Sequence, residues 1–337
     1  MTKDLAKRLA LGAVALAAVL WIGCDQQPEP QQRRRRYRIA LVMKSLANEF
    51  FKTMEDGARA HQKKNADVYE LLANGIKDER DVERQVAIVD QMIAQKVDAI
   101  VIAPADSKAL IPICKKALDA GIVVVNIDNK FDEDALRQRG LRIPFVGPDN
   151  RKGARMAGEY LAKFLKPGDK VAIVEGIPNA INGVMRKLGF EAAMNSAGVE
   201  VVASQSAYWE MDKAEKVVAG MLTQHPDLKA ILCANDSMAL GALAALKAAG
   251  KLGKVLVVGY DNISAIQKQI LAGNVLCTVD QHADQIAVEG IRYALDILHG
   301  RVDPKAPDKE TRVDLITAET LKARAPSAET PKRPGPG

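Results

Sequence analysis

Two stretches of the sequence repeat one another and decide the fold. The first reads DAIVIAPADSKAL over residues 98–110 and resumes as AGIVVVNIDN over residues 120–129. The second reads DLKAILCANDSMAL over residues 227–240 and resumes as AGKLGKVLVVGYDN over residues 249–262. Each copy predicts an apolar strand, a helix that starts at a D-S-x-A-L segment with Asp or Ser placed to cap it, and a second strand ending in Asp-Asn. The chain therefore contains two like halves.

The same alternation extends through the body of the chain. Apolar residues recur at helical spacing over Val82–Gln95 and Ile181–Ala197, and the runs between helices are short, apolar throughout and rich in β-branched residues. Such runs suit a parallel sheet covered on both faces, so the pattern predicts a doubly wound α/β fold. The length of 337 residues accommodates two such domains at roughly 150 residues each. The predicted strands are Ile39–Met43, Val68–Leu72, Ala99–Ala103, Ile122–Ile127, Val171–Val174, Val199–Ala203, Ala230–Cys233, Val255–Val258 and Val275–Val279.

The repeat places one carboxylate at the end of a strand in each half. Asp128 and Asp261 follow equivalent predicted strands, at the carboxyl ends where open α/β sheets bind ligands. If the halves face one another, the two side chains converge on one interdomain cleft. The alternative is that each aspartate caps the helix that follows it. The repetition of the pair favours ligand binding.

The first residues predict an export signal and a lipid attachment site. Residues 1–24 begin with basic side chains and continue as an uncharged apolar run over Leu9–Gly23, shorter than the about 20 residues that a membrane span needs. The run ends in LWIGC, which resembles the lipobox of bacterial lipoproteins, although Trp21 stands where that family usually has Leu. The resemblance implies cleavage before Cys24 and lipidation of that cysteine. An uncleaved anchor and an ordinary signal peptide are the alternatives.

Flexible segments are predicted beside the signal and at the far end. Residues 25–37 have no apolar face and read as a tether, in which the arginines 33–36 either lie against anionic lipid or are simply solvated. Asp25 resembles the signal that retains lipoproteins on the inner of two membranes. The Pro-rich residues 323–337 are predicted to be disordered.

Charge and composition exclude several classes of function. Hydrophobic residues make up 48% and charged residues 27%, which is ordinary for a globular protein with a core. The net charge is +6, but residues 1–38 carry +5 of it and leave the body at +1. No basic field is present that would hold a nucleic-acid backbone. The sequence also lacks GxGxxG and GxxxxGK[ST] motifs, which weakens dinucleotide and P-loop interpretations.

The cysteines and histidines predict neither a disulfide framework nor a metal site. Cys114, Cys233 and Cys277 are an odd number and each lies in an apolar stretch, which favours buried free thiols and leaves one pair open. No CxxC or clustered His/Cys spacing is present. We therefore expect no metal and no cofactor.

Several further segments together carry a resemblance to a known family. From about Arg38 to Leu321 the chain resembles the ribose-binding-like periplasmic sugar-binding proteins, the type I substrate-binding components of ABC importers. That family has two similar lobes joined by crossing strands, which close over one monosaccharide without a chemical reaction. The matching segments are Ser45–Phe51, Ile181–Phe190, Trp209, Leu222–Leu243, Gly259–Asn262 and Thr278–Asp284.

The resemblance also implies lobe boundaries and site residues. It assigns residues 38–146 with 282–308 to one lobe and residues 147–281 with 309–322 to the other. Phe50 or Phe51 and Trp209 would sandwich a sugar ring, with the two aspartates accepting bonds from its hydroxyl groups. The polar and aromatic candidates implied around them are Asn48, Asn129, Asn182, Asn235, Tyr260 and Gln281.

Some positions depart from the family pattern. Ribose-binding proteins have Arg after the first aspartate, where this chain has Asn129, and the Arg expected before Met185 is Val184. Arg186 matches a position that is structural in the family, and Ala103 stands where an Asn follows the third strand. We therefore expect a pocket short of donors, which disfavours ribose itself. Another sugar or polyol, or a cation such as an amino sugar or polyamine, remains open.

The leading hypothesis is a monomeric, lipid-anchored sugar-binding protein outside the cytoplasmic membrane that serves an ABC permease. A sensory lipoprotein that signals to a membrane receptor is an alternative that the sequence does not separate from it. A LacI-type repressor needs a DNA-binding module of about 60 residues ahead of the body, where this chain has signal and tether. An enzyme is disfavoured, because the carboxylates lack a nucleophile, metal ligands or a cofactor loop beside them.

Overall fold

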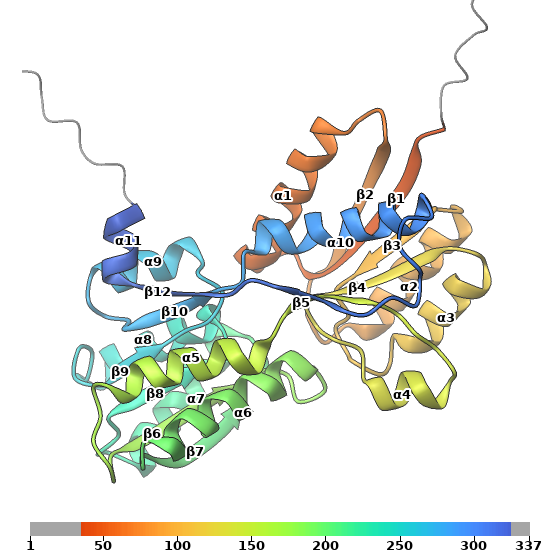
Figure 1. Ribbon diagram of the computed structural model, residues 1–337. Coiled ribbons are helices and arrows are strands. Elements are labelled where there is room, and N and C mark those ends of the chain that lie inside the picture. The colour runs from red at the N-terminus through yellow and green to blue at the C-terminus, as the bar shows by residue number, and fades with distance from the viewer. Residues whose placement is uncertain (1–34, 325–337) are drawn as a thin grey trace, which may run out of the picture. The chain divides into compact units, whose positions relative to one another are not determined.

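The computed structural model describes residues 35–324, which form two lobes that are each built on one sheet. The first lobe comprises the elements that surround the first sheet (Figure 1). They are β1 (Tyr37–Ser45), α1 (Glu49–Lys64), β2 (Tyr69–Ile76), α2 (Val82–Ala94), β3 (Ala99–Ile102), α3 (Ile111–Asp119), β4 (Val123–Ile127), α4 (Glu133–Gln138), β5 (Phe145–Pro148), α10 (Ala283–Leu298) and β11 (Lys309–Thr311).

The second lobe is built in the same way around the second sheet. Its elements are α5 (Asn150–Ala162), β6 (Lys170–Glu175), α6 (Ile181–Ser196), β7 (Glu200–Ser206), α7 (Met211–Gln224), β8 (Ala230–Cys233), α8 (Asp236–Ala248), β9 (Leu256–Val258), α9 (Ser264–Leu271), β10 (Cys277–Asp280), β12 (Asp314–Thr317) and α11 (Ala318–Arg324).

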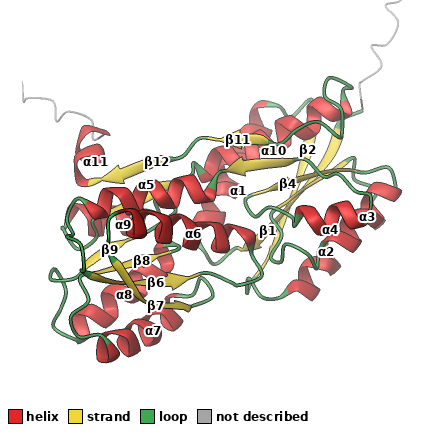
Figure 2. Ribbon diagram, turned by 60° about the horizontal axis from the view of Figure 1, so that its bottom comes forward, coloured by secondary structure: helices red, strands yellow, loops and turns green. Residues whose placement is uncertain are grey.

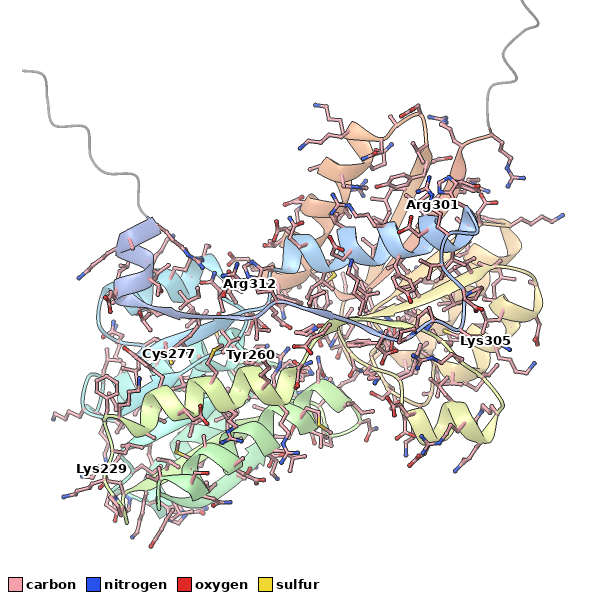
Figure 3. The ribbon with its side chains drawn as sticks, in the orientation of Figure 1. Lys229, Tyr260, Cys277, Arg301, Lys305 and Arg312 are labelled. Carbon is pink, nitrogen blue, oxygen red and sulfur yellow. The ribbon has the colours of Figure 1, made fainter. Side chains whose placement is uncertain are left out.

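The two sheets share one strand order and differ only in the direction of an edge strand. In the described part of the chain each sheet has six strands, in the orders β11-β5-β4-β3-β1-β2 and β12-β10-β9-β8-β6-β7. Every pairing in the first sheet is parallel, and in the second only the edge strand β12 runs antiparallel, against β10. Helices cover both faces of each sheet (Figure 2). The predicted fold of two doubly wound parallel-sheet lobes is confirmed.

The core explains why these residues form these elements. Strands β3 and β8 are buried along their whole length, as their unbroken apolar runs predict for sheets covered on both sides. In the first lobe α1 and α10 pack together on one face while α2 and α3 cover the other. In the second lobe α5 and α6 pair on one face, and α7 with α8 on the other.

The chain passes between the lobes at segments that the apolar pattern did not reveal. The nine predicted strands are all present, but β5, β11 and β12 are additional. The crossings follow β5, β10 and β11, and the last of them is traced in Figure 1 as the blue segment that leads into β12. Because β11 pairs with β5, this crossing falls after Thr311, whereas the sequence had placed residues from 309 onward in the second lobe.

The D-S-x-A-L segments predict one helix start correctly and one wrongly. In the second lobe the segment does open α8, although the side chain that caps this helix is that of Asn235, which accepts a hydrogen bond from the Met238 amide at 2.9 Å. In the first lobe the corresponding segment forms a turn, in which Asp106 accepts from the Lys108 and Ala109 amides, and α3 begins only at Ile111. The pattern shared by the two halves therefore hides different local structures.

Several predictions concern residues that lie outside the described range. These are the export signal, the lipid attachment at Cys24, most of the tether and residues 325–337 of the tail. The first two residues of the predicted disordered tail, 323 and 324, belong to helix α11 instead. Within residues 35–324 no helix has the length and apolar character needed to cross a membrane. In the same range Cys114, Cys233 and Cys277 are buried and free, and burial raises the pKa of each thiol.

Candidate functional site

A pocket lies between the lobes, at the carboxyl ends of the parallel strands. The space inside it that the centre of a water-sized sphere can reach is about 10 Å³, close to what one water molecule needs. The side chains therefore nearly fill the space between the lobes. The lining residues are Lys44, Asn48, Phe50, Phe51, Glu79, Asp128, Asn182, Arg186, Trp209, Asn235, Asp261 and Gln281.

The two repeated aspartates both line this pocket. Asp128 follows β4 and Asp261 follows β9, and both are buried in left-handed backbone, with φ of 60° and 119°. Such conformations cost an L-residue of order 1–3 kcal/mol and are held by the structure around them. The sheet ends thus bring together the pair that the internal repeat predicted, and each carboxylate has a cationic neighbour from its own lobe.

Lys44 is the cation beside Asp128. It ends the apolar run of β1 and is buried, with its Nζ 3.1 Å from Asp128 Oδ2 and 3.5 Å from a carboxylate oxygen of Glu79. Burial lowers the pKa of Lys44, but the two carboxylates outweigh it and the net shift is upward. Burial raises the pKa of Glu79 against the opposing charge of Lys44.

Arg186 is the cation beside Asp261, and it is also tied into the scaffold. Its Nη1 lies 3.4 Å from Asp261 Oδ1 and donates to the Ala234 carbonyl at 2.8 Å, while Nε donates to Asn150 Oδ1 at 2.8 Å. The guanidinium carbon lies 3.8 Å from the centroid of the Tyr260 ring. Burial raises the pKa of Asp261 well above its usual value, and Arg186 opposes that rise.

Aromatic rings from both lobes form the apolar part of the pocket. Phe50 and Phe51 pack edge to face, with centroids 5.1 Å apart and an interplanar angle of 85°. Trp209 comes from the second lobe, in the same buried cluster, and its ring fills the space where a Cβ on Gly176 would stand. The Lys44 ammonium lies 5.4 Å from the Phe51 centroid and 5.8 Å from a Trp209 ring.

Three polar atoms of the lining are buried without a hydrogen-bond partner in the described residues. Trp209 Nε1 is a donor, and Gln281 Oε1 is an acceptor whose amide nitrogen already donates to Asp261 at 2.7 Å. The third is Asp128 Oδ2, which has only the ion-pair contact with Lys44. Since buried polar groups are nearly always satisfied, the pocket calls for a ligand that both accepts and donates.

Two predicted site residues do not line the pocket. Tyr260 is fully buried beneath Arg186, and its hydroxyl would meet a Cβ on Gly153. Asn129 turns away from the pocket, because the left-handed turn at Asp128 directs it toward the Pro104 carbonyl, to which it donates at 2.9 Å. The other candidates reach the pocket: Asn48, Phe50, Phe51, Asp128, Asn182, Trp209, Asn235, Asp261 and Gln281.

The prediction of a pocket short of donors is wrong. Lys44 and Arg186 line the pocket and supply two cationic donor groups. Val184, which stands where the family pattern has an arginine, is exposed and lies outside the lining. Lys44 carried a usable signal, because it ends an apolar strand run just as Asp128 follows one. Glu79 follows β2 by a few residues and carried no comparable pattern.

Contacts between the lobes hold the pocket closed. Ala180 precedes α6 with a side chain that cannot accept, and the first lobe supplies the caps: the Ile181 amide donates to Ser107 Oγ at 3.0 Å and the Asn182 amide to Asn129 Oδ1 at 3.1 Å. The Ser264 amide at the start of α9 donates to Glu49 Oε1 at 2.7 Å. Amides in the first turn of two helices are thus satisfied across the cleft.

Known proteins agree with this architecture. A model described as a periplasmic binding protein domain matches residues 39–301. The D-ribose/D-allose-binding protein of Pseudomonas aeruginosa is 55% identical over 94% of this chain and 99% of its own length.

Two solved structures are similarly close. An ABC transporter solute-binding protein from Burkholderia multivorans is 56% identical, with a TM-score of 0.82 over 84% of this chain and 100% of its own. One from Actinobacillus succinogenes with bound D-allose is 36% identical, with a TM-score of 0.80 over 86% of this chain and 100% of its own.

These proteins bind their ligands and do not transform them. The family match spans most of the chain, and the similar relatives cover nearly all of their own length. The chain therefore belongs to the periplasmic binding protein family and is a ribose-binding-like, non-enzymatic sugar-binding component of an ABC importer.

Proposed function

We propose that the pocket binds one aldose in its pyranose ring form, D-ribose or D-allose. The observation that carries this is the set of buried, unpartnered donors and acceptors beside aromatic rings in the pocket between the lobes. Support also comes from relatives whose names or bound ligands specify these sugars. The two sugars share the configuration of the ring hydroxyl groups at C2, C3 and C4, and allose adds a hydroxymethyl group at C5.

Each part of the lining has a role toward such a ring. The phenylalanines and Trp209 take its C–H faces, a contact worth about 1 kcal/mol beyond the area that it buries. Asp128 and Asp261 accept from neighbouring hydroxyl groups, at roughly 1.5–3 kcal/mol for each charged bond. Lys44 and Arg186 donate to hydroxyl or ring oxygens, in place of the arginines that the family pattern has at positions 129 and 184. Asn48, Asn182, Asn235 and Gln281 complete the polar lining.

The charges of the pocket favour a neutral ligand over a cationic one. Each aspartate already has a cation within 3.4 Å, and burial raises the pKa of Glu79 and Asp261. An ammonium group on the ligand would approach Lys44 and Arg186 in a site with little water to screen the repulsion. We therefore do not extend the proposal to amino sugars or polyamines.

Isothermal titration of the purified protein tests the ligand class. D-Ribose or D-allose is expected to bind, and D-glucose, which differs from allose only at C3, to bind more weakly because one hydroxyl loses its partner. Glucosamine and putrescine are expected not to bind, because of the two cations. Binding of putrescine in preference to every neutral sugar, or no binding of any sugar by folded protein, would contradict the proposal.

The lobes are proposed to open and close about the three crossing segments. Residues 38–148 with 283–311 form the first lobe and residues 149–282 with 312–324 the second. The closed monomer is the form that delivers the sugar to the permease. A sugar that contacts both lobes binds the closed form better and so shifts the equilibrium toward it.

The N-terminal residues are proposed to tether this binding protein to a membrane. Support comes from the sequence alone: the LWIGC segment, Cys24 itself and the polar, arginine-containing stretch of residues 25–37 that leads to the folded body. The tether would hold the sugar site near its transporter. Residues 323–337 are not needed for either role in this proposal.

Substituting the cysteine tests the anchor. In a bacterium that processes lipoproteins, the full-length protein is expected in the membrane pellet and to incorporate labelled fatty acid. The Cys24→Ser variant is expected in the soluble fraction without label, because serine lacks the thiol that is lipidated. A wild-type protein that is equally soluble and unlabelled would exclude lipid anchoring and would leave sugar binding untouched.

A further inference from the structure

A strained loop carries Asp261 into the pocket. The segment Gly259–Ile263 links β9 to α9, and two successive residues in it have positive φ, 119° at Asp261 and 58° at Asn262. L-residues rarely adopt this backbone, so the loop keeps it only if its surroundings impose it. The Asp261 amide donates to the Val279 carbonyl at 2.8 Å, which fixes the beginning of the loop.

Asp236 fixes the rest of the loop from the neighbouring helix. Its side chain is completely buried at the first residue of α8. Oδ2 accepts from the Ile263 amide at 2.9 Å, and Oδ1 accepts from Thr278 Oγ at 2.7 Å. The Thr278 hydroxyl in turn accepts from the Asn262 amide at 3.3 Å.

The backbone completes the same clamp. The Asp236 amide donates to the Tyr260 carbonyl at 2.7 Å, so α8 grips the loop on both sides of Asp261. A Cβ on Gly259 would lie 2.0 Å from Asp236 Oδ1, so only glycine allows the carboxylate to come so close. The loop is therefore shaped around this one side chain.

The equivalent aspartate of the first lobe does something else. Asp106 occupies the same place in the D-S-x-A-L repeat, but it is partly exposed and only closes a local turn. The loop of Asp128 is held instead by Asn126, which accepts from the Phe131 amide at 2.8 Å and donates to the Asn129 carbonyl at 2.8 Å. Two like halves thus hold their ligand aspartates by different means.

We propose that Asp236 is a positioning residue for ligand binding, which together with Thr278 holds the Gly259–Ile263 loop in the conformation that presents Asp261 to the sugar. This inference rests on the proposed function, because it takes Asp261 as a ligand-binding residue. Asp236 is not in the pocket lining and acts through Asp261.

The protonation of Asp236 gives this role a signature. Burial raises its pKa to about 7, although the bonds from Thr278 and the loop amides oppose the rise. The groups that face it are the thiols of Cys233 on β8 and Cys277 on β10, whose pKa burial raises, and the carboxylate of Asp261. Protonation of Asp236 places an O–H donor where the Ile263 amide and the Thr278 hydroxyl already donate. Acid therefore weakens the hydrogen bonds that hold the loop.

Through Asp236, folding stability and sugar affinity change with pH in opposite directions. Because the folded-state pKa lies above the usual 3.8, the folded protein retains a proton that the unfolded chain loses as the pH rises from about 4 to 7. Through Asp236, stability therefore falls over this window as the pH rises. As the pH then passes through about 7, Asp236 becomes ionised and sugar affinity rises. A residue with only a structural role would not move the two quantities in opposite directions.

Titration of D-allose and D-ribose at pH 6 and pH 8 tests the proposal. Asp236→Asn is expected to raise the Kd about tenfold at pH 8, since an amide cannot accept from both donors. Asp106→Asn, the matched control in the other lobe, is expected to leave it unchanged. The wild-type Kd is expected to rise between pH 8 and pH 6, and Asp236→Asn to show a smaller rise, which comes from the carboxylates of the pocket itself. Thr278→Val, which keeps the shape of Thr278, provides the test if Asp236→Asn fails to fold.

Hydrogen exchange separates this inference from the sugar assignment. In Asp236→Asn without ligand, the amides of Asp261 and Ile263 are expected to exchange faster than in the wild type, while those of the Asp128 loop do not. Unchanged exchange and an unchanged Kd, or pH profiles identical to the wild type, would overturn the proposal. If the wild type binds neither sugar, the sugar assignment fails, and the exchange rates still decide whether Asp236 holds the loop.

Discussion

Asp128→Asn is expected to raise the Kd for the sugar by at least about a hundredfold while the protein stays folded. The change removes a charged acceptor for the ligand hydroxyl groups, and each such bond contributes roughly 1.5–3 kcal/mol. Asparagine keeps the size of the side chain and tolerates left-handed backbone, so the turn at φ 60° survives. Titration calorimetry with D-allose and D-ribose measures the loss.

Alanine is the wrong substitution at this position. Both substitutions remove the carboxylate that pairs with Lys44, and breaking a buried ion pair costs about 3–5 kcal/mol of stability. Alanine also removes the side-chain oxygen with which asparagine can still accept a hydrogen bond from Lys44. Affinity and folding would then fall together and could not be separated.

A double-mutant cycle that combines Asp128→Asn with Lys44→Met distinguishes two roles of Asp128, namely accepting a hydrogen bond from the sugar and balancing the charge of Lys44. If Asp128 only balances Lys44, the double variant has the affinity of Lys44→Met alone and regains the wild-type melting temperature. If Asp128 binds the sugar, the stability of the double variant recovers while its affinity stays below that of Lys44→Met. An Asp128→Asn variant with wild-type Kd would place the sugar elsewhere.

The fold could be predicted where burial leaves a pattern. Strands covered on both faces read as unbroken apolar runs, and every such run became a strand. The missed crossing strands lack that pattern: β11 is Lys309-Glu310-Thr311, largely exposed, and β5 contains Gly147 and Pro148. Their position is fixed by pairing with strands distant in sequence, which no local pattern encodes.

The site could be predicted only in part, for a related reason. Asp128 and Asp261 stood out because the two halves repeat. Lys44 and Glu79 lie outside the two repeated segments. Lys44 could have been found because it ends an apolar run, as Asp128 follows one, whereas Glu79 lies in a loop after β2 that has no such pattern. Asn129 is predicted to line the pocket because it follows Asp128. The left-handed backbone at Asp128 instead turns the Asn129 side chain away from the pocket. Adjacent residues at such turns do not share a direction.

Arg186 shows best what sequence alone leaves out, because it joins the pocket to the scaffold. One guanidinium bonds Asn150 at the start of α5, directly after a crossing strand, and the Ala234 carbonyl at the end of β8. It also lies against Tyr260 and beside Asp261. Arg186 therefore has a structural role and a role in the ligand site at the same time.

Arg186→Lys is accordingly expected to reduce both sugar affinity and stability. Lysine keeps the charge but has neither the planar face that stacks on Tyr260 nor enough fixed donors to bond Asn150, Ala234 and Asp261 together. We expect the Kd to rise about a hundredfold and the melting temperature to fall by several degrees, as a loss of about 2 kcal/mol implies for a domain of this size.

The control is Arg155→Lys, on the exposed face of α5, where the side chain pairs only with Glu159. It is expected to change neither quantity, because an exposed ion pair contributes less than about 1 kcal/mol. A variant of Arg186 that loses stability but binds sugar normally would make it a scaffold residue, and one that loses only affinity would make it a ligand residue. If one guanidinium serves both the pocket and the scaffold, Arg186→Lys loses affinity and stability together while the Arg155→Lys control keeps both.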